Sequence, residues 1–283
     1  MQVLKIKSFL LKIPGVIILK YLKRKSIDYF FKIDSLRFNR TINVFCFGKK
    51  QFKILDFGRL CRYRARTFEL KEPETISWIK AFSPDDKLLD VGANIGMYSL
   101  FAASLGLKVI AIEPEALNNA MLNLNIRVNK YNSLIKAFCI SLHSENKVNF
   151  LNISSSASNW GSAQNNFNNN IDWTGKKTFK PVYTQGSIGL SIDYFLRDLS
   201  ENINHLKVDV DGNEFLIMQG AKELLNSSHI KSILIELVDG RHDYEDTIKY
   251  IESFNFELVY KGHSSMYEDD PFSEVYNHIF QKK

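Results

Sequence analysis

Residues 88–100 read LLDVGANIGMYSL, an apolar run that leads through two glycines into a second, mostly apolar run. The first run predicts a buried strand, the glycines at 92 and 96 predict a tight turn, and residues 97–105 predict a helix. Such a turn lets a ligand approach the backbone and lie near the N-terminus of the helix. This junction therefore predicts the fold class together with the place of a binding site.

C-terminal to this junction, predicted strands and helices alternate. The strands cover residues 87–92, 108–114, 134–140, 205–210 and 232–237. The helices cover residues 97–105, 116–129, 190–199 and 214–225. Residues 257–260 and 274–280 alternate in polarity instead and predict a terminal antiparallel pair. We therefore expect an α/β fold with a Rossmann-like, doubly wound, mostly parallel sheet and an antiparallel C-terminal strand.

On the N-terminal side the pattern is less regular. Residues 42–47 and 52–57 predict a β-hairpin, and residues 74–82 predict a helix. We assign residues 1–63 to an N-terminal extension, formed by a basic amphipathic segment and this hairpin. Residues 64–283 form the main domain.

The net charge of +6 is unevenly distributed along the 283 residues. Residues 1–25 contain seven Lys and Arg and no acid, so they carry +7 and the other 258 residues sum to −1. A near-neutral body argues against a nucleic-acid partner. Lys12 and Pro14 interrupt the apolar run, so we expect neither a signal peptide nor a membrane span. A basic amphipathic helix on an anionic membrane and a solvated helix packed on the body both remain open.

The three cysteines, Cys46, Cys61 and Cys139, are widely spaced and form no CxxC pair. They indicate reduced thiols in a reducing compartment rather than a zinc or redox site. We therefore expect a cytoplasmic protein, either free or peripheral at the inner face of the membrane.

Two features near the junction indicate an adenosine-type cofactor. Glu113 ends the next predicted strand about 20 residues after the turn, where an acid can bind both ribose hydroxyls. GxGxxG is missing, because Asn94 takes the middle place between Gly92 and Gly96. Asp90 at the strand end would repel a pyrophosphate but would favour a cofactor with an ammonium and a sulfonium. S-adenosylmethionine fits this pattern better than NAD, FAD or ATP.

Over residues 64–283 the sequence resembles the FkbM family of S-adenosylmethionine-dependent methyltransferases. The blocks that carry the resemblance are KEPETISWI (71–79), LLDVGANIGMYSL (88–100), AIEPEALNNAMLNLN (111–125), QGSIGLSID (185–193), HLKVDVDGNEFLIMQGA (205–221) and SILIEL (232–237). The resemblance implies a class I methyltransferase fold and a set of cofactor-binding residues. These are Glu72, Asp90, Gly92, Asn94, Gly96, Tyr98, Glu113 and Ser141. Leu142 stands where the family often has an acid or Asn, so the adenine contacts stay unassigned.

Methylation of a hydroxyl also needs a base within hydrogen-bond reach. The candidates follow two predicted strands and are Asp209, Asp211, Glu236 and His242. Asp209 lies in an apolar run, so it either pairs with Lys207 or His205 or faces the site. We expect its carboxylate on the same side of an extended strand as that of Asp211.

Each of the other candidates has a structural alternative. Asp211 and Asn213 could cap the next helix. Glu236 could be a buried, hydrogen-bonded acid, and His242 a surface histidine. Asp209, Asp211 and Glu214 are also oxygen ligands of the kind that magnesium or calcium accepts. The resemblance requires no metal, so we predict none.

An Asn-rich insertion at residues 141–188 interrupts the alternation and includes a predicted strand at 147–153. Asn159 and Trp160 offer groups suited to a sugar, so the insertion is either an acceptor-binding lid or a polar loop anchored by Trp160. We expect O-methylation of a sugar hydroxyl in a glycan, a polysaccharide precursor or a glycosylated natural product. The alternatives are a nicotinamide-dependent oxidoreductase and a non-catalytic module that retains the cofactor.

Overall fold

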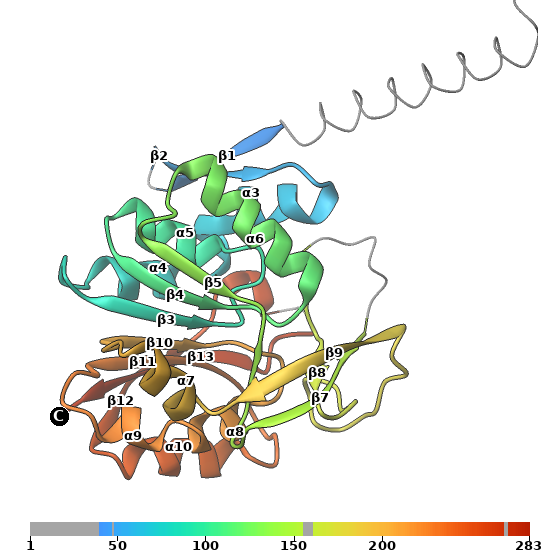
Figure 1. Ribbon diagram of the computed structural model, residues 1–283, viewed down its shortest axis with the longest axis vertical. Helices are drawn as coiled ribbons and strands as arrows, with labels where there is room; N and C mark the ends of the chain where they lie inside the picture. Colours follow the sequence, from blue (N-terminus) through green and yellow to red (C-terminus); the bar gives the residue numbers. More distant parts are fainter. Residues whose placement is uncertain (1–39, 47, 155–160, 269–270) are drawn as a thin grey trace, which may run out of the picture.

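The computed structural model describes residues 40–46, 48–154, 161–268 and 271–283. Within them, a seven-stranded sheet lies between two layers of helices (Figure 1). Its strands are β3 (Lys87–Val91), β4 (Lys108–Ile112), β5 (Ile135–Phe138), β10 (His205–Val208), β11 (Ser232–Val238), β12 (Phe256–Gly262) and β13 (Val275–Lys282). Their order in the sheet is β12-β13-β11-β10-β3-β4-β5.

The strands from β11 to β5 run parallel, whereas β13 is antiparallel to both β11 and β12. The predicted doubly wound sheet with an antiparallel C-terminal pair is therefore confirmed. One layer of helices contains α3 (Arg59–Lys71), α4 (Pro73–Lys80), α5 (Met97–Ser104) and α6 (Ala116–Asn129). The other contains α7 (Ile192–Leu199), α8 (Glu214–Gln219), α9 (Lys222–Asn226) and α10 (Tyr244–Glu252).

Side chains of β3 show how one strand supplies two cores. Leu88 packs in the cluster of α3 to α6, whereas Leu89 and Val91 pack in the cluster of α7 to α10. This alternation follows from the two-residue period of a strand. It explains why the strand reads as a continuous apolar run, since both faces are covered.

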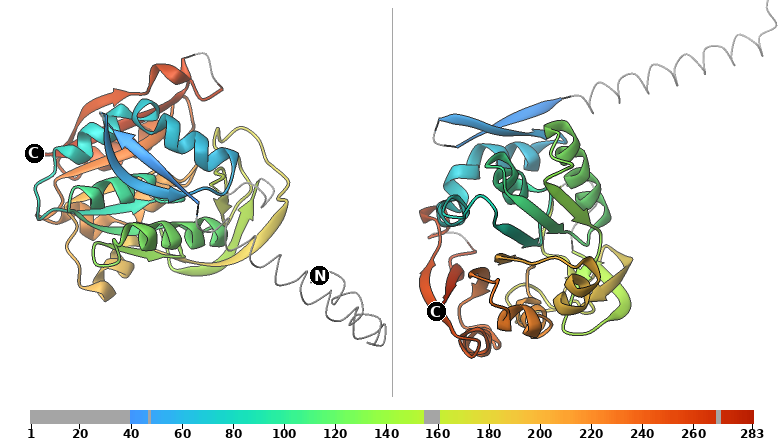
Figure 2. Two further views of the ribbon diagram at one scale, coloured as in Figure 1. Left: turned by 90° about the horizontal axis from the view of Figure 1, so that it is seen from above. Right: turned by 60° about the vertical axis from the view of Figure 1, so that its left-hand side comes forward.

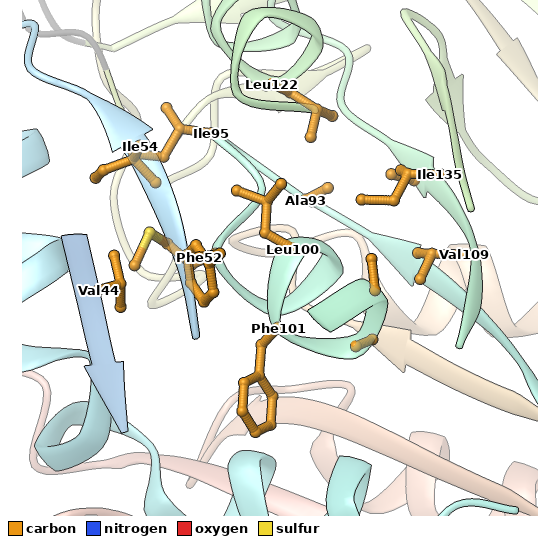
Figure 3. Close-up of a cluster of buried hydrophobic side chains, with 14 of the residues drawn as sticks. Val44, Phe52, Ile54, Ala93, Ile95, Leu100, Phe101, Val109, Leu122 and Ile135 are labelled. Carbon is orange, nitrogen blue, oxygen red and sulfur yellow. The ribbon is translucent and has the colours of Figure 1, made fainter. Parts of the chain in front are cut away.

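The predicted hairpin is confirmed as β1 (Thr41–Cys46) and β2 (Lys49–Leu55), which pair antiparallel. Figure 3 shows Val44 and Phe52 of this hairpin beside Leu100 and Phe101 of α5. The blue hairpin lies against the layer that contains α5 and α6 in both views of Figure 2. The hairpin thus shares its hydrophobic core with the main sheet.

Amide side chains of α6 bind the backbone of β2. The N–H of Leu55 donates to Oδ1 of Asn125 at 2.8 Å, and the N–H of Lys53 donates to Oδ1 of Asn129 at 2.8 Å. The division that we placed between residues 63 and 64 falls inside α3.

One predicted helix differs in the structure, and two helices of the structure were not predicted. The helix expected at 214–225 is wrong, because α8 ends at Gln219 and α9 starts at Lys222. The chain breaks at Gly220, where a Cβ would collide with the backbone oxygen of His143. Neither α3 nor α10 was predicted, and each buries only two or three side chains.

The insertion forms a second, smaller sheet. Its strands are β6 (Ser141–Leu142), β7 (Lys147–Ile153), β8 (Asn166–Phe167) and β9 (Tyr183–Leu190), in the order β6-β9-β7-β8. The predicted strand at 147–153 is confirmed, whereas β9 was not predicted, since Gly186 and Gly189 weaken its strand pattern.

Two sequence predictions lie outside the described residues, namely the basic segment 1–25 and the pair Asn159 and Trp160. Among the residues that are described, no helix has both the length and the apolar character that crossing a bilayer requires.

Candidate functional site

A cavity of about 480 Å³ opens where the parallel strands of the main sheet end. The strands from β4 to β13 each place at least one side chain or turn on its wall. These are Glu113 after β4, Gly92 and Asn94 after β3, Asp209 and Asp211 after β10, Glu236 on β11, and Val275 and Asn277 on β13. The sheet therefore sets the order of these groups along the cavity. Ligands of open α/β sheets bind at this edge.

The turn between β3 and α5 is packed directly on the loop after β10. Gly92 has φ +85°, and a Cβ there would collide with the backbone oxygen of Asp209. Asn94 has φ 52° and lines the cavity. Gly96 starts α5 with φ +93°, and a Cβ there would collide with Leu122 of α6. Gly92 and Asn94 thus form the wall, whereas Gly96 is needed for helix packing.

Glu113 places a buried carboxyl group beside this turn. It is 6% exposed and accepts hydrogen bonds from the backbone N–H of Asn94 at 2.8 Å and of Glu115 at 2.9 Å. Burial raises its pKa to about 8, against the effect of these two bonds. Each oxygen keeps a free lone pair, so the side chain can still accept from a pair of ligand hydroxyls.

Asp90 lies behind the turn rather than on the cavity wall. It is 1% exposed, and the Ser99 hydroxyl donates to its Oδ2 at 2.5 Å. Its Oδ1 has no hydrogen-bond partner among the described residues. Burial raises the pKa of Asp90, while the nearby Lys207 ammonium lowers it.

Two further predicted cofactor residues do not line the cavity. The Tyr98 ring lies 5.0 Å from Nζ of Lys207, and burial followed by the Glu72 carboxylate raises its pKa well above 10. Ser141 belongs to the second sheet, where its hydroxyl lies 3.0 Å from that of Ser187. The cofactor contacts predicted for Tyr98 and Ser141 stay predictions.

Two ion pairs lie between the turn and the far end of the cavity. Oδ2 of Asp209 accepts from Nζ of the fully buried Lys207 at 2.7 Å, and Oε1 of Glu72 accepts from Lys71 at 3.1 Å. Burial favours the neutral form of Asp209, but the Lys207 and Lys71 ammonium groups outweigh it and hold its pKa below 3.8. The sequence left open whether Asp209 pairs with a neighbouring base or faces the site. In the structure it pairs with Lys207 and also lines the cavity.

Asp211 also lines the cavity, but not by strand alternation. The expectation of an extended strand was wrong, because β10 ends at Val208 and Asp211 has φ 61°. Its Oδ2 accepts from the backbone N–H of Gln164 at 2.6 Å. Burial and the Asp209 carboxylate raise its pKa to about 6. A non-glycine residue in this conformation is strained, and such strain concentrates at functional sites.

The last two candidate bases are placed differently. Glu236 lines the cavity, makes no hydrogen bond to another described residue, and has a pKa raised well above 4.5 by burial and by Asp209. His242 is exposed and lies outside the cavity wall. Asn213 occupies the N-cap position of α8 but makes no capping bond, since its amide donates to Asn166 at 2.8 Å.

A segment of the insertion, residues 161–165, covers one side of the cavity, and we call it the strap. The carbonyl of Gly161 accepts from Nη2 of Arg64 at 2.6 Å, and its N–H donates to Oδ1 of Asn118 at 2.8 Å. The carbonyl of Ser162 accepts from the amides of Asn94 at 2.8 Å and Asn118 at 2.9 Å. The strap is thus tied to α3, to α6 and to the glycine turn.

Sequence reasoning missed part of the wall. The missed residues include Arg64, Lys71, Glu74, Asn118, His263, Tyr267, Phe272 and Asn277. Asn277 gave no signal, because a polar residue is ordinary in a strand that alternates in polarity. The other C-terminal residues gave none either, since their place at the cavity depends on the order of strands. Among the described residues, no group of three or more His, Cys, Asp or Glu side chains is arranged to hold a metal ion.

The sequence was compared with protein families and with curated proteins. The sequence model of the family described as "Methyltransferase FkbM domain" matches residues 90–258, which is more than half of the chain. No curated protein is significantly similar in sequence.

Solved structures with a similar chain trace include several methyltransferases. The ribosomal protein L11 methylase of Lactobacillus delbrueckii subsp. bulgaricus is 12% identical over 77% of this chain and 79% of that chain, with a TM-score of 0.44. Precorrin-6y C5,15-methyltransferase of Geobacter metallireducens GS-15 is 11% identical over 75% and 86%, with a TM-score of 0.43. Aeropyrum pernix fibrillarin with natively bound S-adenosyl-L-methionine is 12% identical over 74% and 73%, with a TM-score of 0.41. These similarities are too low to carry an argument about activity.

Proposed function

Because the chain belongs to the FkbM family of methyltransferases, which use S-adenosylmethionine, we propose that it methylates an oxygen of a sugar hydroxyl. The acceptor would belong to a glycan, a polysaccharide precursor or a glycosylated natural product. The observation that carries the proposal is the extent of the cavity. It continues from Glu113 after β4 to Asn277 on β13, well past the glycine turn that would hold the cofactor. Neighbouring strands lie about 4.8 Å apart, so this span leaves room for a second molecule.

The residues at one end of the cavity fit the cofactor. Glu113 would hold the ribose hydroxyls, and the backbone at Gly92 and Asn94 would hold the methionine part. The carboxyl groups that face the cavity suit a ligand with an ammonium and a sulfonium. When bound, the cofactor supplies a methyl group on a sulfonium, which a nucleophile attacks in line.

Asp211 is the base in this proposal. A carboxyl with a pKa of about 6 is ionised at neutral pH and still basic enough to take the proton of the acceptor hydroxyl as its oxygen is methylated. Asp209, held by Lys207, stays ionised and keeps Asp211 in place through the loop that they share. The strap, Tyr267 and Phe272 keep water from the reacting groups.

Family membership leaves the nicotinamide-dependent oxidoreductase without support. A non-catalytic module would bind the cofactor but transfer no methyl group. We also propose that residues 1–25 hold the protein at an anionic membrane surface through their charge of +7.

A transfer assay tests the proposed acceptor. The purified protein is incubated with radiolabelled S-adenosylmethionine and a set of glycans, and the labelled product is hydrolysed to monosaccharides. We expect the label in an O-methyl sugar, and transfer by the Asp211→Asn variant that is slower by about a hundredfold or more. Label found only on nitrogen, or only on protein or lipid, would contradict the proposal.

A further inference from the structure

The end of the cavity farthest from Glu113 is formed by α4, β13 and the segment between β12 and β13. Glu74 of α4 and Asn277 of β13 line it, together with His263, Tyr267 and Phe272. This end lies three strands away from β3, which carries the glycine turn. A cofactor bound over β3 and β4 therefore leaves it open.

Glu74 lies at this end of the cavity, and one of its two carboxyl oxygens accepts a hydrogen bond from a described residue. It is 8% exposed, and its Oε1 accepts from the amide of Asn277 at 2.6 Å. Its Oε2 is buried and has no hydrogen-bond partner among the described residues. The first turn of α4 favours a negative charge at this position. Asn277 thus fixes the direction of the carboxyl group, and the second oxygen remains able to accept a bond.

His263 presents a second unpaired group in the same region. Its Nδ1 is buried without a partner in the described part of the chain, and its ring packs on Tyr276 at a centroid distance of 4.3 Å. Buried polar atoms are normally paired, and leaving them unpaired costs stability. Two such atoms at one end of a cavity indicate a place for a polar ligand.

The charges around this end disfavour an anion. Six carboxyl groups line the described wall of the cavity: Glu72, Glu74, Glu113, Asp209, Asp211 and Glu236. Only Arg64 and Lys71 on this wall carry a permanent positive charge. Burial raises the pKa of Glu74, Glu113, Asp211 and Glu236, so negative charge is already unfavourable in this cavity. A carboxylate or phosphate on the acceptor would add to it.

We propose that Glu74, His263 and Asn277 form the acceptor subsite of this enzyme. The subsite binds hydrogen-bond donors, which are hydroxyl groups or an ammonium group, and it excludes acceptors with a carboxylate or phosphate next to the methylated hydroxyl. The inference rests on the proposed function, because it assigns the acceptor end of the same cavity.

Four methyl glycosides that share one ring test the chemistry of the subsite. They carry a hydroxyl, an ammonium, a carboxylate or a phosphate group at one position, and each is incubated with the enzyme and radiolabelled S-adenosylmethionine. We expect label in the hydroxyl or ammonium glycoside. Faster labelling of the carboxylate or phosphate glycoside overturns the inference and leaves the proposed function intact. Label in no sugar, with the cofactor still bound, contradicts the proposed function and the inference with it.

Variants test the residues themselves. Glu74→Gln can still accept the hydrogen bond from Asn277, but it cannot carry a negative charge. We expect this variant to raise the acceptor KM about tenfold, because the acceptor loses one charge-assisted hydrogen bond. The cofactor Kd of Glu74→Gln should equal that of the wild-type protein. Glu245→Gln, which changes an exposed residue on α10, is the control and should have wild-type kinetics. His263→Phe gives a second variant that keeps the ring contact with Tyr276. Wild-type acceptor KM in both variants would overturn the assignment.

Discussion

At the scale of single residues, the site contains carboxyl groups of the same kind in different protonation states. Lys207 keeps Asp209 ionised, whereas burial raises the pKa of Asp211 to about 6 and that of Glu113 to about 8. Glu236 has no ion pair with a described residue, and burial and then the Asp209 carboxylate raise its pKa well above 4.5. Surroundings that separate the pKa values of like groups assign them different tasks.

The first prediction concerns the base. Asp211→Asn should lower kcat by about a hundredfold or more, because it removes general-base catalysis. For the wild-type enzyme, kcat/KM should rise with pH and level off above about 6, since the raised pKa of Asp211 means that the active carboxylate form exists only above that value. A pH profile of the methyl-transfer rate measures both effects.

Glu236→Gln is the matched control for this prediction. Burial and then the Asp209 carboxylate raise the pKa of Glu236 and favour its neutral form, so an uncharged side chain of the same shape should keep most of the activity. The assignment is wrong if Glu236→Gln loses activity as severely as Asp211→Asn does.

Sequence reasoning identified part of the site at this scale. The spacing of Gly92, Asn94 and Glu113 was sufficient, because a turn and the end of the next strand must meet at one edge of a parallel sheet. Spacing did not indicate that Asp90 faces α5 and bonds Ser99. Glu74 and Asn277 were missed, because they lie 203 residues apart and meet only through tertiary structure.

At the scale of elements, the strap links the insertion to the cofactor end of the cavity. Its backbone bonds to Arg64, Asn94, Asn118 and Asp211, all of which line the cavity. A ligand beneath it can leave only after some of these bonds break. The strap should therefore control how fast the cofactor product dissociates.

Removing a strap anchor tests this role. Asn118→Ala deletes two hydrogen bonds to the strap, and Arg64→Ala deletes two hydrogen bonds to the carbonyl of Gly161. Each variant should speed dissociation of S-adenosylhomocysteine about thirtyfold, as expected from two bonds worth about 1 kcal/mol each. Stopped-flow displacement measures the rate, with Arg62→Ala on the exposed side of α3 as control. Unchanged dissociation rates in both anchor variants would contradict the role.

The hairpin is a second element whose part in the molecule can be measured. Phe52 is 1% exposed and packs edge-on against Phe68, whereas Phe45 of the same hairpin is 53% exposed. Phe52→Ala should lower the free energy of unfolding by about 3–5 kcal/mol. Phe45→Ala should change it by less than about 0.5 kcal/mol. Denaturant unfolding compares the two, and an equal, small effect would show that the hairpin is not part of the core.

Elements with strong patterns were predicted, and those with weak patterns were not. The strands β3, β4 and β11 are mostly apolar runs, and Met121, Leu122 and Ile126 of α6 have helical spacing, so their positions could be read directly. The break between α8 and α9 depends on the contact of Gly220 with His143, which no local pattern contains.

At the scale of the whole molecule, the order of strands sets the distance between the proposed cofactor position and the proposed acceptor subsite. The sheet runs from β4 and β3, which carry Glu113 and the glycine turn, through β10 to β11 and β13. The fold class was predictable from the alternation of strands and helices. The position of β13 between β11 and β12 was not, although it brings Asn277 to the acceptor end.

The central claim is that Glu113 and the glycine turn bind S-adenosylmethionine. Isothermal titration of the full chain measures this binding directly. Glu113→Ala should weaken the affinity about a hundredfold, because it removes two hydrogen bonds to the ribose hydroxyls. His242→Ala, which changes an exposed residue outside the cavity, should bind as the wild-type protein does. Wild-type affinity in a folded Glu113→Ala variant would contradict the account.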